Sequence, residues 1–359
     1  MWTSDGVSHG VGRDLPRLTS VRAFAALWVF GFHAYSYAPS RAATPFRTGY
    51  VGVGLFFVLS GFILTWVSPG DVPATRFYFR RFARIYPAYV VALVLAAILA
   101  GLPSLRSLAA TLGLLQAWFT TGRMVFGLNP PSWSLSCEAA FYAAFPFVLP
   151  RLRRLRHRRL LLVHGLWFGL IAGVVVALAL HGGLGAKIAY TNPLLRSGEF
   201  GLGILCALLV QRGSRLLSLR AALTLLTVAA VLAALYPPTY PTVDVLLAPP
   251  FALLIAALAW KDLHHVRGLL QSPVLILAGQ VSFCFYLVHQ EILRAYARSF
   301  SPLPATALAL VTAAAVAWVL HVTVERPAQT WLTAHSPRRR TSTELADNAE
   351  GGQPSRPHG

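Results

Sequence analysis

The segment RAFAALWVFGFH, residues 22–33, is an apolar run that begins with an arginine and ends with a histidine. A charged side chain near the centre of a membrane helix costs roughly 2.5–3.5 kcal/mol, so it needs a partner, a water-filled cavity or a function. On an ideal helix, the spacing of Arg22 and His33 separates them by about 20° in direction and about 16 Å along the axis. The spacing predicts that both line one cavity at two depths. Alternatively, Arg22 reaches the cytoplasmic interface and His33 lies at the outer boundary.

The apolar character of this segment extends along the chain. Of 359 residues, 56% are hydrophobic and only 12% are charged, which excludes an ordinary soluble domain. A membrane helix needs roughly 20 mainly apolar residues, and ten windows approach that length: 20–37, 50–67, 84–101, 133–150, 160–180, 192–211, 219–236, 243–260, 273–293 and 304–324. The sequence predicts an all-α, polytopic integral membrane protein with about ten transmembrane helices. The shorter apolar stretch 107–119 is expected to be re-entrant or interfacial.

The positions of the arginines set the expected sidedness. Basic residues outnumber acidic ones 31 to 12, and most lie in alternate short loops and at the two termini. Because cytoplasmic loops carry the excess of basic residues, we expect both termini in the cytoplasm, a plasma-membrane location and no nucleic-acid partner. The expected organisation is a cytoplasmic N-terminal segment (1–18), a transmembrane domain (19–327) and a disordered cytoplasmic tail (328–359).

Ionisable residues in or beside the spans are the candidates for function: Arg22, His33, Glu138, Arg196, Glu199, His289, His321 and Glu325. Arg196 and Glu199 can satisfy each other on one helix face. Glu138 has no basic residue within helical reach, so it needs a partner from another helix or must stay protonated. No metal site is expected, because no second cysteine or histidine stands at ligand spacing from Cys137, Cys206 or Cys284.

The segment RFYFRRFARIYP places Arg80, Arg81 and Arg84 at a helix entrance on the expected cytoplasmic side. Guanidinium groups there could bind the phosphates of a ligand through paired hydrogen bonds. The same cluster is also the ordinary charge signal of a cytoplasmic loop.

Six phrases, in order between residues 17 and 327, together resemble the acyltransferase-3 family of membrane O-acyltransferases. They are RLTSVRAFAALWVFGFH, GYVGVGLFFVLSGFIL, RFYFRRFARIYPAYVVAL, WSLSCEAAFYAAFPF, AGQVSFCFYLVHQEIL and the closing ERP. The resemblance implies a ten-helix domain that moves an acyl group, usually acetyl, from acyl-coenzyme A to a hydroxyl. It implies acyl-coenzyme A as a substrate, with no permanently bound cofactor. The implied acceptor is a sugar, a glycan or a glycosylated natural product such as a macrolide.

The resemblance also implies roles for individual residues. Arg22 and His33 match the functional pair of the first helix, Glu138 matches the glutamate of the W-x-L-x-x-E motif, and the donor-binding motif matches Arg80, Arg81 and Arg84. The supporting motifs of the last two spans match Tyr286, His289 and Glu325. Histidine, with an unperturbed pKa of about 6.5, suits a general base, and we expect Glu138 to orient a catalytic or binding group. Direct transfer is favoured over an acyl-enzyme, which stays open.

A different class of protein also places histidine and glutamate inside a membrane. In proton-coupled transporters such residues form proton relays. The arginine motif and the absence of visible internal repeats argue against this alternative.

Overall fold

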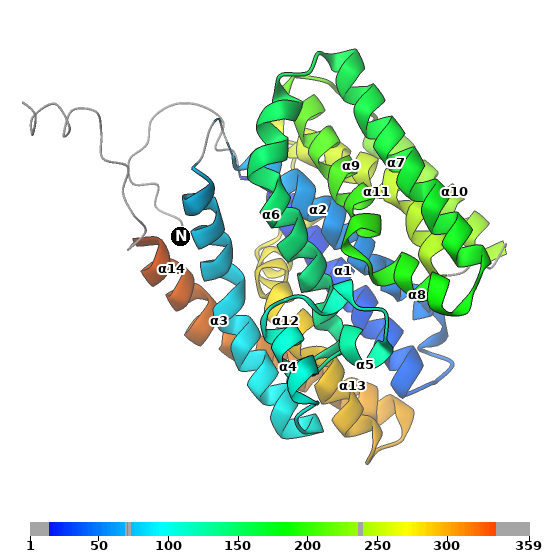
Figure 1. The fold of residues 1–359 in the computed structure, drawn as a ribbon, viewed down its shortest axis with the longest axis vertical. Coiled ribbons are helices and arrows are strands. Elements are labelled where there is room, and N and C mark those ends of the chain that lie inside the picture. Colours follow the sequence, from blue (N-terminus) through cyan, green and yellow to red (C-terminus); the bar gives the residue numbers. More distant parts are fainter. Residues whose placement is uncertain (1–13, 69, 71–72, 236–239, 335–359) are drawn as a thin grey trace, which may run out of the picture.

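The computed structural model describes residues 14–68, 70, 73–235 and 240–334, which contain helices and no strand (Figure 1). The α-helices are α1 (Pro16–Tyr37), α2 (Gly52–Trp66), α3 (Ala74–Ala100), α4 (Leu105–Leu112), α5 (Gly122–Val125), α6 (Trp133–Arg153), α7 (His157–Leu180), α8 (Gly183–Thr191), α9 (Pro193–Gln211), α10 (Leu219–Leu235), α11 (Tyr240–Leu263), α12 (Pro273–Ala297), α13 (Pro302–Leu320) and α14 (Arg326–Ala334). Short 3₁₀ turns are η1 (Thr44–Phe46), η2 (Gly49–Val51), η3 (Gln116–Trp118), η4 (Pro130–Ser132) and η5 (Leu269–Gln271), and η6 (His321–Glu325) is a π-helical turn. The all-α prediction is confirmed.

Each of the ten expected windows coincides with one helix, in some cases together with its flanking turn. Within the described residues, seven helical segments are long and apolar enough to cross a membrane, and α10 is a shorter apolar helix. Helices α1 and α6 are not among the helices that are long and apolar enough to cross a membrane by this criterion. The chain is therefore a multi-pass membrane protein, and the count of ten spans stays a prediction.

Helices α1 and α12 pack side by side and run in the same direction. Near their N-terminal ends, the backbone of Thr19 lies against Gly279, and further along both helices His33 meets His289. Parallel packing is the relation expected between the first and ninth spans of a chain whose spans alternate in direction. In Figure 1, α3 and α14 lie on one side of this central pair, and α7, α10 and α11 lie on the other.

Helices α2 and α9 approach each other closely through glycines. A Cβ atom on Gly203 would collide with the carbonyl oxygen of Val58, and one on Gly61 would collide with that of Phe200. In membranes, where no hydrophobic effect drives helices together, small residues allow the backbone contact that holds them. This contact fixes α2 beside α9 and so positions one wall of the central cavity.

Two helices cross the expected domain boundaries. Helix α1 begins at Pro16, inside the expected N-terminal segment, because proline is favourable in the first turn of a helix. Residues 328–334, expected in a disordered tail, belong to α14, an amphipathic helix that packs against α3. The rest of the expected terminal segments, residues 1–13 and 335–359, lies outside the described residues.

The segment between α3 and α6 contains short helices and turns, and no eleventh span. Asn129, at the end of this segment, donates a hydrogen bond from Nδ2 to the carbonyl oxygen of Leu287, at 2.8 Å, in the middle of α12. Non-helical backbone is tolerated at such depth only where protein groups satisfy it. The end of the connection therefore enters the bundle and places the start of α6 inside the fold.

Candidate active site

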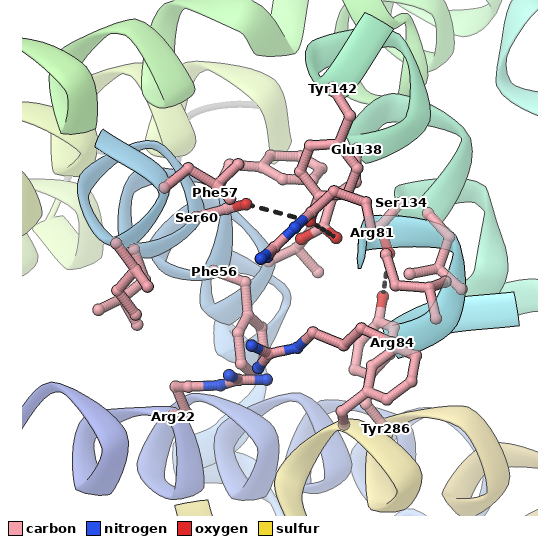
Figure 2. Close-up of a pocket in the computed structure, with 17 residues that line it drawn as sticks. Arg22, Phe56, Phe57, Ser60, Arg81, Arg84, Ser134, Glu138, Tyr142 and Tyr286 are labelled. Carbon is pink, nitrogen blue, oxygen red and sulfur yellow. Dashed lines mark hydrogen bonds between the residues drawn. The ribbon is translucent and has the colours of Figure 1, made fainter. Parts of the chain in front are cut away.

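Five helices, α1, α2, α3, α6 and α12, line a partly open cavity of about 80 Å³ (Figure 2). Its walls carry the phenylalanines Phe56, Phe57 and Phe283 and several aliphatic side chains. The polar groups that line it are Arg22, Ser60, Arg81, Arg84, Ser134, Glu138, Tyr142 and Tyr286. Three guanidinium groups and one carboxylate thus face the same small space, which gives the cavity an excess of positive charge.

The three expected donor-binding arginines divide between two faces of α3. Arg81 and Arg84, one helical turn apart, both line the cavity, whereas Arg80 is exposed on another face. The Arg81 guanidinium lies 5.8 Å from the ring centre of Phe77, and its Nε atom has no hydrogen-bond partner among the described residues. Figure 2 shows the side chain of Arg84 reaching toward that of Arg22. Arg81 and Arg84 are therefore available to an anionic ligand, and Arg80 is not part of this site.

Glu138 is held by its own helix. Tyr142, one turn further along α6, donates a hydrogen bond from Oη to Glu138 Oε2 at 2.6 Å, and Ser60 Oγ lies 3.4 Å from the same hydroxyl. The basic groups that face Glu138 across the cavity come from α1 and α3. The hydrogen-bond partner of Glu138 thus comes from its own helix, whereas a partner from another helix was the expectation.

Tyr286 closes the cavity on the α12 side. Its hydroxyl lies 2.9 Å from Ser134 Oγ and donates to the carbonyl oxygen of Pro131 at 3.0 Å. These bonds tie α12 to the start of α6. The ring of Tyr286 also contacts that of Phe56, at 5.8 Å between centres.

His33 and His289 form a second group, adjacent to the cavity. His33 Nδ1 lies 2.9 Å from His289 Nε2, and the two rings stack with centres 5.0 Å apart. His289 is fully buried, and its Nδ1 atom lies 2.8 Å from the carbonyl oxygen of Tyr286 and 3.2 Å from that of Phe285. His33 does not line the cavity, so the prediction that it shares one cavity with Arg22 is wrong.

The hydrogen bonds of this pair fix which ring nitrogens carry protons when both rings are neutral. A carbonyl oxygen only accepts hydrogen bonds, so the proton of His289 is on Nδ1 and its Nε2 carries a lone pair. His33 must then donate from Nδ1 to His289 Nε2. The remaining nitrogen, His33 Nε2, carries a lone pair, and no described residue donates a hydrogen bond to it. This atom can accept a proton.

The cavity and the histidine pair are linked through α12. Tyr286 lines the cavity with its side chain, and its backbone carbonyl orients His289 one turn further along the helix. Phe30 of α1 packs against both Phe285, at 5.7 Å, and His289, at 6.2 Å. The two groups are therefore joined by packed side chains of α1 and α12.

Glu325 lies apart from the cavity lining. Its Oε2 atom accepts hydrogen bonds from His321 Nδ1, at 2.7 Å, and from Cys284 Sγ, at 3.1 Å. Within the described part of the chain, these three side chains are the group whose ligand atoms lie close enough together to hold a metal ion. Because Glu325 already accepts from both neighbours, the cluster is satisfied as a hydrogen-bond network that ties α12 to η6.

Arg196 and Glu199 form the expected ion pair, with 2.9 Å between Nη2 and Oε1. A second carboxylate, from Asp244 of α11, binds Arg196 Nη1 at 2.6 Å. The guanidinium also lies over the rings of Tyr190, at 5.2 Å, and Phe57, at 5.3 Å. All three charged groups are buried, so this cluster holds α9, α11 and α2 together behind the cavity wall.

An acyltransferase domain model, that of the acyltransferase-3 family, matches residues 15–323.

The chain belongs to the acyltransferase-3 family.

Relatives in this family carry acyltransferase names. The chain is 33% identical to the acyltransferase MdmB of Streptomyces mycarofaciens, over 93% of this chain and 97% of that protein. It is 30% identical to the peptidoglycan O-acetyltransferase OatA of Listeria monocytogenes, over 45% of this chain and 28% of that protein. It is 29% identical to an O-acetyltransferase OatA of Staphylococcus aureus, over 38% of this chain and 25% of that protein. No solved structure matches.

Membership of the acyltransferase-3 family makes the chain an O-acyltransferase with a multi-pass membrane domain. Sequence reasoning for this family member missed several residues of the site. Ser134 and Tyr142 stand one turn before and one turn after Glu138, so helical periodicity offered a signal for both. Asp244 is an acid near the start of an expected span, and an acid in that position is a signal for a buried partner.

Proposed function

We propose that this acyltransferase-3 protein takes an acyl group, most simply acetyl, from acyl-coenzyme A and transfers it to a hydroxyl of a sugar, a glycan or a glycosylated natural product such as a macrolide. It acts in the plasma membrane with both termini in the cytoplasm. Arg81 and Arg84 bind the phosphates of the donor, Arg22 orients the donor beside them, and His33 is the general base. The observation that carries the proposal is the free lone pair on His33 Nε2, fixed by the bond from His33 to His289.

The reaction needs one proton acceptor and a stabiliser of negative charge. A thioester carbonyl is already electrophilic, so the hydroxyl oxygen attacks it while His33 Nε2 takes the hydroxyl proton. The carbon–sulfur bond then breaks, the ester forms, and the proton passes to the coenzyme A thiolate. His289 acts as a positioning residue that holds His33 in the tautomer this step requires.

The charge of the cavity supports the donor assignment. Three arginines face it, and Glu138 is the acid among its described lining residues. Guanidinium groups bind phosphates through paired, charge-assisted hydrogen bonds. The shared cavity supports a role for Glu138 in orienting Arg22, Arg81 or Arg84, with Tyr142 holding its carboxylate.

The proposal is tested with two donors, one with and one without the phosphate-bearing nucleotide. Purified protein in detergent is titrated with acetyl-coenzyme A and with acetyl-pantetheine, which keeps the thioester and lacks the nucleotide. We expect binding of acetyl-coenzyme A, much weaker binding of acetyl-pantetheine, and loss of this difference in Arg81→Ala. Equal affinity for both donors would contradict the role of the arginines.

A further inference from the structure

A second, larger opening lies away from the candidate active site. It is a groove of about 550 Å³, within the size range of small-molecule sites, at the end of the bundle where α1 and α10 end and α11 begins. Its walls are apolar and come from α10 and α11: Leu226, Ala230, Ala233, Ala234, Val243 and Leu247. Helix α11 is long and apolar enough to cross a membrane, and α10 is a shorter apolar helix. The walls of the groove therefore lie within the membrane.

Two arginines stand at the mouth of this groove. Arg41 and Arg47, from the connection between α1 and α2, line it and are exposed. Within the described residues neither forms an ion pair with an acid. The acid next to the wall, Asp244, is already bound to Arg196. The groove therefore has apolar walls and, at one end, two arginines that form no ion pair with a described acid.

We propose that this groove binds an anionic phospholipid, with its phosphate on Arg41 and Arg47 and an acyl chain along the apolar walls. Arginine suits the headgroup because its planar fork binds phosphate oxygens in pairs. The apolar walls suit the chain, because burial of each methylene adds to the affinity. The groove shares no residue with the cavity, so its occupancy does not depend on the proposed acyl transfer.

The experiment compares three probes on purified protein by native mass spectrometry. Phosphatidylglycerol and phosphatidylcholine with identical chains differ in net charge, and glycerol 3-phosphate carries the phosphate without a chain. We expect the wild type to bind phosphatidylglycerol in preference to the other two. In the double variant Arg41→Gln with Arg47→Gln, affinity for phosphatidylglycerol should fall about ten- to thirtyfold. Each basic residue near an anionic lipid raises the affinity about several-fold.

Two further variants separate the parts of the site. Ala230→Phe, which fills the channel from an exposed position, should also weaken binding of phosphatidylglycerol. Arg298→Gln is the matched control, because Arg298 is an exposed arginine at the C-terminal end of α12, at the same end of the bundle. Unchanged phosphatidylglycerol binding in the double arginine variant would overturn the proposal. So would equal loss in Arg298→Gln, or competition by glycerol 3-phosphate as strong as by the lipid.

Discussion

His33 Nδ1 lies 2.9 Å from Nε2 of His289, a residue 256 positions away in the sequence. The buried His289 ring is itself held by the carbonyl oxygens of Tyr286 and Phe285, so the direction of each hydrogen bond in the pair is determined. The pair leaves one unshared lone pair, on His33 Nε2. This is the arrangement by which a neighbour orients a histidine base.

Replacement of His289 tests its positioning role. His289→Phe keeps the ring volume and removes the acceptor, so His33 is no longer held in one tautomer. We expect kcat to fall about 10- to 100-fold, the size typical of a lost orienting partner, with little change in KM for the donor. His289→Gln, whose amide can both donate and accept, should recover part of the loss. A similar fall in both variants together with a lower midpoint of thermal unfolding would point to a structural role instead.

The division of the arginines on α3 gives a matched comparison. Arg81→Ala and Arg84→Ala each remove a cavity group, and we expect the Kd for acetyl-coenzyme A to rise about 10- to 100-fold, since hydrogen bonds to charged groups contribute about 1.5–3 kcal/mol. Arg80→Ala removes an exposed arginine of the same motif and should bind donor like the wild type. Isothermal titration in detergent measures all three. Weakening by Arg80→Ala to the same degree would contradict the assignment of the cavity.

The buried cluster of Arg196, Glu199 and Asp244 predicts a loss of stability. Arg196→Leu leaves two carboxylates buried without their cation, and breaking a buried pair in this way costs about 3–5 kcal/mol. We expect a lower midpoint of thermal unfolding in detergent. Arg298→Leu, at an exposed position, should stay within about 0.5 kcal/mol of the wild type. Equal stability of both variants would show that the cluster does not hold α9 and α11 together.

The glycine contact between α2 and α9 predicts opposite results for two alanine substitutions. In Gly203→Ala the new Cβ meets the backbone of Val58, and we expect destabilisation of about 1–3 kcal/mol from overpacking. In Gly169→Ala the new Cβ meets open space, so the better helix propensity of alanine should leave the stability unchanged or slightly higher. Thermal unfolding of the two variants in one detergent makes the comparison. Destabilisation by Gly169→Ala would contradict the packing of α7.

The helices could be predicted from the sequence because the length of a membrane span constrains them directly. Each expected window falls on a helix, from the first at α1 to the last at α13. Helix α14 was not expected because the residues after 327 resemble a disordered tail in composition, yet this helix packs on α3. Contact with a neighbouring helix determines whether such a segment folds.

The composition of the site was less predictable than the helices. Helical spacing placed Arg22 and His33 on one face, but their neighbours come from distant parts of the chain. Arg22 meets Arg81 and Arg84 across the cavity, whereas His33 meets His289. A single sequence carries no information on which helices are adjacent, so it could not separate the two groups.

The measurement that tests the account most directly is acyl transfer by His33→Ala. Radiolabelled acetyl-coenzyme A is supplied to the purified wild type and variant with a panel of acceptors that includes monosaccharides, glycans and glycosylated macrolides, and donor binding is measured in parallel. We predict that the variant binds the donor as the wild type does and transfers acetyl at least about 100-fold more slowly, the contribution expected of a general base. Transfer by His33→Ala at the wild-type rate would contradict the account.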